Sequence, residues 1–414
     1  MTVVEFFDTN AVENIVSALL CAPERVVLVG DNHKRMAKAK VRYEEIAAAH
    51  QLQVTFSYES VNRNDLQDII KKLETIIAKY GECTFDLTGG EDLYLVAVGA
   101  VFCAHRDKVQ LHRFNIRNGR LYDCDADGQI LAVKQASLTI EENVKAYGGR
   151  VIFEAEKENT TYRWDFNQAF CADLDRMWRI CKKNYAQWND AVHALDGFHT
   201  CCVQDKTALS VFIEPEQVKD VLLQRGYPAF FSGSFFKELE TYDLIHSLTF
   251  STAGIAFTYK NEQVKRCLTN AGRVLELFVT QTARTLTDQD GKPLFDDVMT
   301  GVTIDWDGKL EADKQEVNNE MDVMLMKDLT PIFISCKNGR NFKSDELYKL
   351  STVAERFGGQ YAKKVLVATR LDEMRESGEA IVNRAAEMGI TVIKIKNDDL
   401  CEQRFTEMLR KLGG

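Results

Sequence analysis

The first 108 residues alternate short apolar runs with amphipathic segments, and this alternation restricts the possible folds most strongly. Four runs rich in β-branched and aromatic residues are predicted to be strands: residues 3–7, 25–29, 53–57 and 84–87. Segments with helical periodicity follow them: residues 11–20, 36–50, 64–80 and 92–104. Because a strand–helix repeat places successive strands in parallel, it predicts an α/β fold with a Rossmann-like, doubly wound sheet.

The pattern changes at residue 109. Residues 109–116 and 120–124 are strand-like and flank Asn118 and Gly119, the pair typical of a tight hairpin turn. We expect this hairpin to form an antiparallel edge of the sheet, and we expect the first domain to cover residues 1–150.

Residues 151–262 have a different character. Residues 165–183 and 235–247 are predicted to be helices, and residues 248–250 and 255–259 suggest a two-stranded wing. The segment lacks a basic recognition helix, so the interpretation as a spacer between two working domains is favoured over a DNA-reading winged helix.

The third expected domain, residues 263–414, mixes both periodicities. Its predicted helices are residues 261–285, 344–357, 377–388 and 400–412, with Ser344 as a candidate N-cap and Gly358 and Gly359 as the stop of the second. Its predicted strands are residues 301–306, 320–326, 331–337, 364–369 and 391–395. These elements predict an α/β core.

Two of those strands carry a carboxylate and a lysine. Asp322 lies at the start of one apolar run, and Lys337 ends the next, with a short turn at residues 327–330. Adjacent antiparallel strands would bring both side chains to one edge of the sheet. A carboxylate binds a divalent cation and a lysine stabilises charge on a phosphate, so the pair indicates phosphodiester chemistry.

Composition excludes several classes of protein. The 414 residues carry a formal net charge of −10, which argues against a generally nucleic-acid-coating protein. No run has the length of a membrane span, and the N-terminus lacks a basic signal-peptide region, so we expect a cytoplasmic protein without membrane contact. The 11 cysteines show no CxxC spacing, which predicts reduced thiols and argues against a zinc site.

Small and polar residues follow three strands of the N-terminal sheet. The C-terminal ends of parallel strands line the ligand crevice of such folds, where backbone N–H groups approach phosphates. The candidate ligand-binding residues at these ends are Asp8, Thr9, Asn10, Gly30, Asp31, Thr88, Gly89, Gly90 and Glu91. Neither a GxGxxG fingerprint nor a Walker A loop is present, so classical dinucleotide binding and ATP hydrolysis are poorly supported.

The Asp8-Thr9-Asn10 and Leu87-Thr88-Gly89-Gly90 loops resemble those of CARF domains, the sensors of CRISPR ancillary proteins. Together with the C-terminal motif, the chain resembles single-CARF ancillary nucleases of type III CRISPR systems, which join a CARF domain to a PD-(D/E)xK nuclease. The resemblance implies a homodimer that binds one cyclic oligoadenylate, usually cyclic tetra-adenylate, between its two CARF domains. It also implies that Thr9, Asn10, Thr88, Gly89, Gly90 and the backbone of Glu91 line the ring.

The same resemblance assigns the nuclease site. It implies that Glu276 on the first core helix and Asp322 hold Mn²⁺ or Mg²⁺ together with the main-chain oxygen of Cys336, and that Lys337 assists. Ser335 stands where the motif has Asp or Glu. Glu320, on the strand of Asp322, and Glu346, on the following helix, are both candidates for the missing carboxylate, and the sequence does not choose between them.

Three functional interpretations follow. The leading one is a metal-dependent nuclease, activated by a cyclic oligoadenylate, that acts on DNA, single-stranded RNA or both. The second is a ligand-sensing regulator whose nuclease fold is catalytically silent and binds DNA, for which Ser335 is the best support. The third, a nucleotide-metabolising enzyme, is weakened by the missing phosphate-loop signatures.

Overall fold

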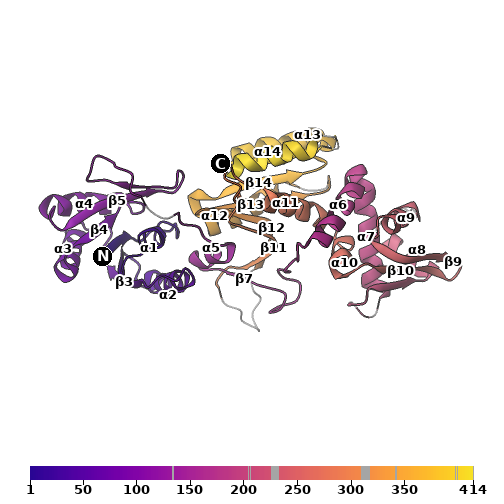
Figure 1. Ribbon diagram of the computed structural model, residues 1–414, viewed down its shortest axis with the longest axis horizontal. Coiled ribbons are helices and arrows are strands. Elements are labelled where there is room, and N and C mark those ends of the chain that lie inside the picture. The colour runs from indigo at the N-terminus through magenta and orange to yellow at the C-terminus, as the bar shows by residue number, and fades with distance from the viewer. Residues whose placement is uncertain are drawn as a thin grey trace.

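The computed structural model describes residues 1–132, 135–203, 205, 207–224, 233–308, 318–340, 343–396, 398 and 400–413. Its strands form three sheets, two with six strands and one with three. The three sheets belong to three parts of the chain, which Figure 1 shows in succession along the longest axis.

The N-terminal sheet has the strand order β3-β2-β1-β4-β5-β6, with β1 to β5 parallel. Its strands are β1 Thr2–Phe6, β2 Arg25–Gly30, β3 Thr55–Ser60, β4 Cys83–Asp86, β5 Val109–Asn115 and β6 Arg120–Asp123. Its helices are α1 Val16–Cys21, α2 His33–Ala49, α3 Leu66–Tyr80 and α4 Asp92–Ala104. The predicted α/β class and the parallel Rossmann-like sheet are confirmed.

The predicted hairpin is present as the antiparallel pair β5–β6, and Gly119 at its turn has a φ of +65°. The helix predicted over residues 11–20 is shorter, because residues 11–15 form turns before α1 begins. The Asn14 side chain holds that segment by accepting from Asp8 N and donating to Asp8 O.

The middle part contains long helices and a small antiparallel sheet of order β8-β10-β9. Its elements are α6 Gln168–Lys183, α7 Tyr185–Cys202, β8 Ser210–Ile213, α8 Pro215–Gln224, α9 Gly233–Thr241, β9 Ile245–Ser251, β10 Gly254–Tyr259 and α10 Glu262–Leu268. The preceding elements, α5 Ile140–Ala146 and β7 Arg150–Val151, lie instead beside α2 and β11. The predicted wing therefore has a third strand, and the predicted helix 235–247 ends at Thr241, since β9 begins at Ile245.

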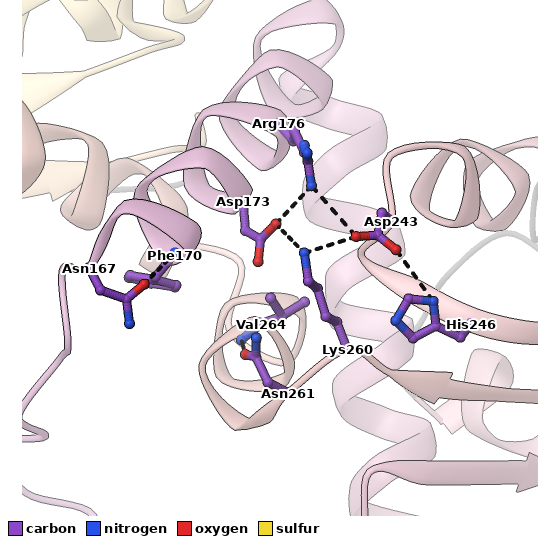
Figure 2. Close-up of polar contacts among 9 residues, drawn as sticks. All are labelled: Asn167, Phe170, Asp173, Arg176, Asp243, His246, Lys260, Asn261 and Val264. Carbon is purple, nitrogen blue, oxygen red and sulfur yellow. Dashed lines mark hydrogen bonds and ion pairs between the residues drawn. The ribbon is translucent and has the colours of Figure 1, made fainter.

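A charged network ties α6 to the end of β10 in this part (Figure 2). Asp173, only 1% exposed, accepts from Lys260 Nζ at 2.8 Å and from Arg176 at 3.0 Å. Lys260 and Arg176 also contact the exposed carboxylate of Asp243, at 3.0 and 3.8 Å. Two cations thus compensate one buried carboxylate and fix the helix to the sheet.

The C-terminal sheet is mixed, with the order β15-β14-β13-β12-β11-β7. Its further elements are α11 Arg273–Thr285, β11 Asp297–Asp305, β12 Asn318–Lys327, β13 Thr330–Lys337, α12 Asp345–Gly358, the 3₁₀ helix η1 Gly359–Tyr361, β14 Lys363–Ala368, the 3₁₀ helix η2 Leu371–Met374, α13 Glu376–Glu387, β15 Ile390–Lys394 and α14 Cys401–Gly413. The helix predicted over 261–285 is broken into α10 and α11. Ser344 occupies the N-cap position of α12 as predicted, although its side chain makes no capping hydrogen bond, and Gly359 at a φ of +54° ends the helix as expected.

The order of the parts in space differs from their order in the sequence. The C-terminal sheet lies between the N-terminal sheet and the middle helices (Figure 1). One buried cluster contains Val26 and Leu28 of the N-terminal sheet together with Met324 and Phe333 of the C-terminal sheet. The interpretation of residues 151–262 as a spacer was therefore wrong, because the first and third parts pack directly on each other. The expected boundaries near 150 and 262 stay predictions.

Among the described helices, none has the length and apolar character needed to cross a bilayer.

Candidate functional site

Asp322 and Lys337 lie on neighbouring strands, as the sequence predicts. Strands β12 and β13 pair in antiparallel register, with Val323 opposite Ile334. The Lys337 Nζ lies 3.9 Å from Asp322 Oδ2. The backbone oxygen of Asp322 accepts from the Thr300 hydroxyl at 3.0 Å, which fixes this strand to β11. The pair is thus held by the sheet itself.

Ser335 and Cys336 orient the Asp322 carboxylate. The Ser335 hydroxyl donates to Asp322 Oδ2 at 3.1 Å, and the Cys336 backbone N–H donates to the same oxygen at 2.6 Å. Ser335 is buried, at 7% exposure. In place of a third carboxylate, the strand therefore offers a hydrogen-bond donor that holds Asp322 in one orientation.

Glu276 approaches this pair from α11 and is joined to Glu320 by an arginine. Arg273 Nη1 lies 2.6 Å from Glu276 Oε2, and Arg273 Nη2 lies 3.5 Å from Glu320 Oε1. Glu276 is buried, and Glu320 is half exposed. The sequence did not single out Arg273. The only indication in the sequence is that Arg273 comes three positions before Glu276, which places both side chains on one face of a helix.

Burial and like charges raise the pKa of Glu276 to about 8. Desolvation is the largest cause, and the charges of Asp322 and Glu320 add to it, while Arg273 opposes it. Arg273 and Lys337 thus offset only part of the combined effect of burial and of repulsion among the three carboxylates.

A divalent metal fits this site by the chemistry of its donors. Buried and half-buried carboxylates with a nearby main-chain carbonyl are the oxygen ligands that Mg²⁺ and Mn²⁺ prefer, and repulsion among the carboxylates adds to the effect of burial in raising the pKa of Glu276. Within the described part of the chain, however, no three His, Cys, Asp or Glu side chains are grouped to hold an ion. Arg273, bound to Glu276 and Glu320, occupies part of the coordinating capacity of both.

The lysine has a second carboxylate partner. Lys337 Nζ lies 2.8 Å from Glu346 Oε2 on α12, closer than it lies to Asp322. Burial alone would lower the pKa of Lys337, but the charge of Asp322 and the hydrogen bond to Glu346 raise it. Glu346 therefore contacts the lysine, whereas Glu320 contacts the arginine beside Glu276.

Asn338 is a structural residue that the sequence did not identify as such. Its side chain is buried and donates to Asn189 Oδ1 at 3.0 Å and to the Ala271 oxygen at 3.4 Å, and it accepts from the Thr369 hydroxyl at 2.9 Å. These contacts fasten the end of the lysine strand to α7, to the segment before α11 and to the end of β14.

A cavity of about 290 Å³ adjoins this strand end. Its lining residues come from α7, from the segment before α11 and from the strand of the lysine, and they are Asn189, His193, Asn270, Ala271, Gly272, Cys336, Lys337, Asn338 and Gly339. Helix α7 of the middle part thus forms one wall of the space beside the lysine, a contribution that the sequence pattern did not predict.

The three predicted ligand loops meet at one edge of the N-terminal sheet, because β1 lies between β2 and β4. The Asp8 carboxylate accepts from the Asn10 N–H at 2.9 Å and from the Thr9 hydroxyl at 3.2 Å, closing the first loop on itself. A Cβ built on Gly30 would lie 3.0 Å from Phe7 Cβ, so Gly30 packs against the end of β1.

The loop after β4 is held from inside the domain. Buried Asp86 accepts from the Thr88 N–H at 2.8 Å and from the Thr88 hydroxyl, and Thr88 Oγ1 accepts from the Phe114 N–H at 2.8 Å. Gly90 has a φ of +104°, and a Cβ there would lie 2.8 Å from Phe6 Cβ. Glycine is therefore required by both backbone and space, and Thr88 uses its side chain to shape the loop.

Arg63 is the cation of this edge, and the sequence prediction missed it. It follows β3 and lies 2.8 Å from Glu91 and 3.6 Å from Asp31. Glu91, whose charge opposes binding of a polyanion, thus has a neutralising partner. The position of Arg63 just after a parallel strand was the available signal.

Known proteins share this architecture. Residues 261–410 match a family model described as Card1-like, endonuclease domain. A search of curated protein sequences found no match.

Two solved structures match over the whole chain. Protein VC1899 from Vibrio cholerae has 20% identity and a TM-score of 0.72, covering 100% of this chain and 98% of its own. Can2 from Sulfobacillus thermosulfidooxidans, solved in complex with cyclic tetra-adenylate, has 16% identity and a TM-score of 0.66, covering 100% and 99%. Residues 261–410 thus belong to the Card1-like endonuclease domains, in a chain whose full-length fold VC1899 and Can2 share.

Proposed function

We propose that this protein is a metal-dependent nuclease that a cyclic oligoadenylate activates in type III CRISPR defence. The observation that carries the proposal is the Asp322–Lys337 pair on adjacent strands, with Glu276 beside it, inside a Card1-like endonuclease domain. DNA, single-stranded RNA or both are its substrates.

Each residue of the nuclease site has a separate role in this proposal. Glu276, Asp322 and the main-chain oxygen of Cys336 would hold Mg²⁺ or Mn²⁺, which would require Arg273 to give up its ion pair with Glu276. The metal, when bound, supplies charge neutralisation at the scissile phosphate and lowers the pKa of water. Ser335 holds Asp322 in its coordinating orientation, and Lys337 places a positive charge against the phosphate.

The activating ligand is proposed to be cyclic tetra-adenylate, bound by the loops after β1, β2 and β4. The full-length fold shared with the cyclic tetra-adenylate complex of Can2 supports this choice. The candidate loop residues are those predicted from the sequence, to which Arg63 adds a cation. Backbone N–H groups of Gly89 to Glu91, just before α4, favour a phosphate there.

A homodimer completes the proposal, and helix α4 supports it. Beyond Asp92 the helix has no charged residue, and its outer face exposes Leu95 and Val96. A helix that is apolar all round is normally buried. Since α4 begins at the Thr88–Glu91 loop, a two-fold axis through α4 would place the two copies of that loop side by side.

The decisive experiment is a cleavage assay with Mn²⁺ on supercoiled plasmid and on labelled single strands, with and without cyclic tetra-adenylate. We expect ligand-dependent cutting that Lys337→Ala reduces by at least about a hundredfold, the lower end of the loss typical of removing a group that stabilises the transition state. Lys411→Ala, an exposed lysine of the same domain, is the control and should cut normally.

A second function has one specific observation in its favour. Ser335 replaces a carboxylate and donates a hydrogen bond to Asp322, which suits a silent nuclease fold that only binds DNA. DNA binding without cutting, under every metal and with the ligand present, would establish this regulator instead.

A further inference from the structure

Helix α12 connects the lysine of the nuclease site to the loops of the N-terminal sheet. Its first turn carries Glu346, which lies 2.8 Å from Lys337 Nζ. Its last residue leads directly into η1, Gly359–Tyr361, which contacts the segment after β1. Fourteen helical residues span about 21 Å, so one rigid element bridges the two sites.

The contacts at the η1 end converge on Glu13. Its Oε1 accepts from the Tyr361 hydroxyl at 2.6 Å and from Gln360 Nε2 at 2.9 Å. The backbone N–H of Gln360 donates to Asn10 Oδ1 at 3.4 Å. A Cβ on Gly359 would lie 2.1 Å from the same oxygen, so the two segments are in close contact.

Glu13 also touches the proposed ligand loop. A Cβ built on Gly89 would lie 3.1 Å from Glu13 Oε2 and 3.2 Å from its Cβ. Glu13 is buried, with 4% exposure. A movement of the Gly89 loop or of Asn10 therefore displaces the groups that hold η1, because no free space separates them.

The helix between the two ends is anchored along one face. Leu347, Leu350, Val353, Ala354 and Phe357 are buried against the sheet. Asn143 Nδ2 donates to the Phe357 oxygen at 2.7 Å, and Arg356 Nη1 donates to the Tyr147 oxygen at 2.7 Å. These contacts favour motion of α12 as a unit rather than fraying of its last turn.

We propose that α12 transmits ligand binding to the nuclease site and that Glu346 is the positioning residue through which it acts. This inference rests on the proposed function. Without ligand, Glu346 holds Lys337 away from the substrate phosphate. Cyclic tetra-adenylate, bound at Asn10 and the Gly89 loop, then displaces Glu13 and η1. The resulting shift of α12 withdraws Glu346 and releases the lysine towards Asp322 and the substrate.

Tyr361→Phe tests the η1 contact, since it removes only the hydroxyl bound to Glu13. We expect the variant to bind cyclic tetra-adenylate within about threefold of the wild type by calorimetry. Ligand stimulation of cleavage should fall at least about fivefold, the lower end of measured allosteric couplings. Tyr348→Phe, an exposed tyrosine of α12, is the matched control. Unchanged stimulation in Tyr361→Phe would overturn the proposal.

Glu346→Gln tests the other end of the helix. Removal of the restraining charge should raise cleavage without ligand at least about tenfold, because the ion pair that holds Lys337 at Glu346 is lost. If cleavage is instead lost with and without ligand, Glu346 supplies the acid missing at Ser335, and the proposal is wrong.

Hydrogen exchange of the full-length protein gives a readout that needs no activity. In Tyr361→Phe, faster exchange should reach the amides of residues 345–350, next to Lys337. Faster exchange confined to residues 358–362 would show that α12 does not connect the ends. A wild type that neither binds the ring nor cuts would contradict the proposed function, while this measurement would still decide the role of α12.

Discussion

At the scale of single residues, Gly90 has the strictest requirement in the proposed ligand loop. Its φ of +104° disfavours any side chain by about 1–2 kcal/mol, and a Cβ would contact Phe6 at 2.8 Å. We therefore expect Gly90→Ala to weaken cyclic tetra-adenylate binding at least about tenfold, measured by calorimetry. Gly119→Ala, at a φ of +65° with open space around it, is the control. Equal affinity in all three proteins would contradict a role for this loop.

Glu5 is a second residue whose properties can be measured, through the pH dependence of the protein's stability. Its side chain is fully buried in β1, and burial followed by the charge of Asp86 raises its pKa well above the usual range. A carboxyl with a raised pKa favours the folded state while protonated, and that advantage is lost as the pH rises from about 4.5 through the folded pKa.

Glu5→Gln removes the ionisation. We expect the variant to unfold at a higher temperature than the wild type at pH 8, with the difference shrinking towards pH 5, in thermal scans at several pH values. Glu74→Gln, on the exposed face of α3, should show no such trend. A difference that grows towards low pH would mean that Glu5 is ionised in the folded protein.

At the scale of elements, the junction of α6 with β10 depends on Asp173. Asp173→Ala leaves Lys260 and Arg176 without their buried partner, which we expect to cost about 3 kcal/mol. Asp243→Ala removes the exposed partner of the same cations and should cost below about 1 kcal/mol. Calorimetric unfolding of both variants tests this order, and equal costs would show that burial does not determine the strength of the network.

Some elements follow from the sequence almost residue by residue. The helix predicted over residues 92–104 matches α4, and the strand predicted over 331–337 lies within β13, because each has an uninterrupted local pattern bounded by turn residues. Helix α7, Tyr185–Cys202, was missed, since most of its faces are buried and it lacks a clear polar side. The break between α10 and α11 depends on the Asn270 side chain, which accepts from the Gly272 N–H.

At the scale of the whole molecule, the exposed apolar face of α4 predicts the assembly. We expect the wild type to sediment as a dimer and Val96→Glu to sediment as a monomer, because the substitution would bury a charge in the interface. Val41→Glu, at an equally exposed valine of α2, should leave the dimer intact. A dimer that persists in Val96→Glu would exclude α4 as the interface.

The C-terminal sheet also determines how the three parts of the chain pack on one another. The C-terminal sheet packs the N-terminal part on one face, through the cluster that includes Met324 and Phe333, and the middle part on the other, through the cluster that includes Val323 and Ile334. Successive side chains of β12 and β13 point to opposite faces of the sheet, so alternate residues of these strands pack against the N-terminal part and the middle part. The segment after β1 contacts η1 of the C-terminal part directly, through Asn10 and Glu13.

The sequence alone determined the α/β class, the parallel N-terminal sheet and the neighbouring strands of Asp322 and Lys337, because these depend on periodicity and turns within a few residues. Only the tertiary structure decided that Glu346 contacts the lysine, that Arg63 neutralises Glu91 and that Asn338 fastens the strand end. Those contacts join side chains from different elements and leave no local pattern. The same holds for Glu13 and Tyr361, 348 positions apart in the chain and 2.6 Å apart in the fold.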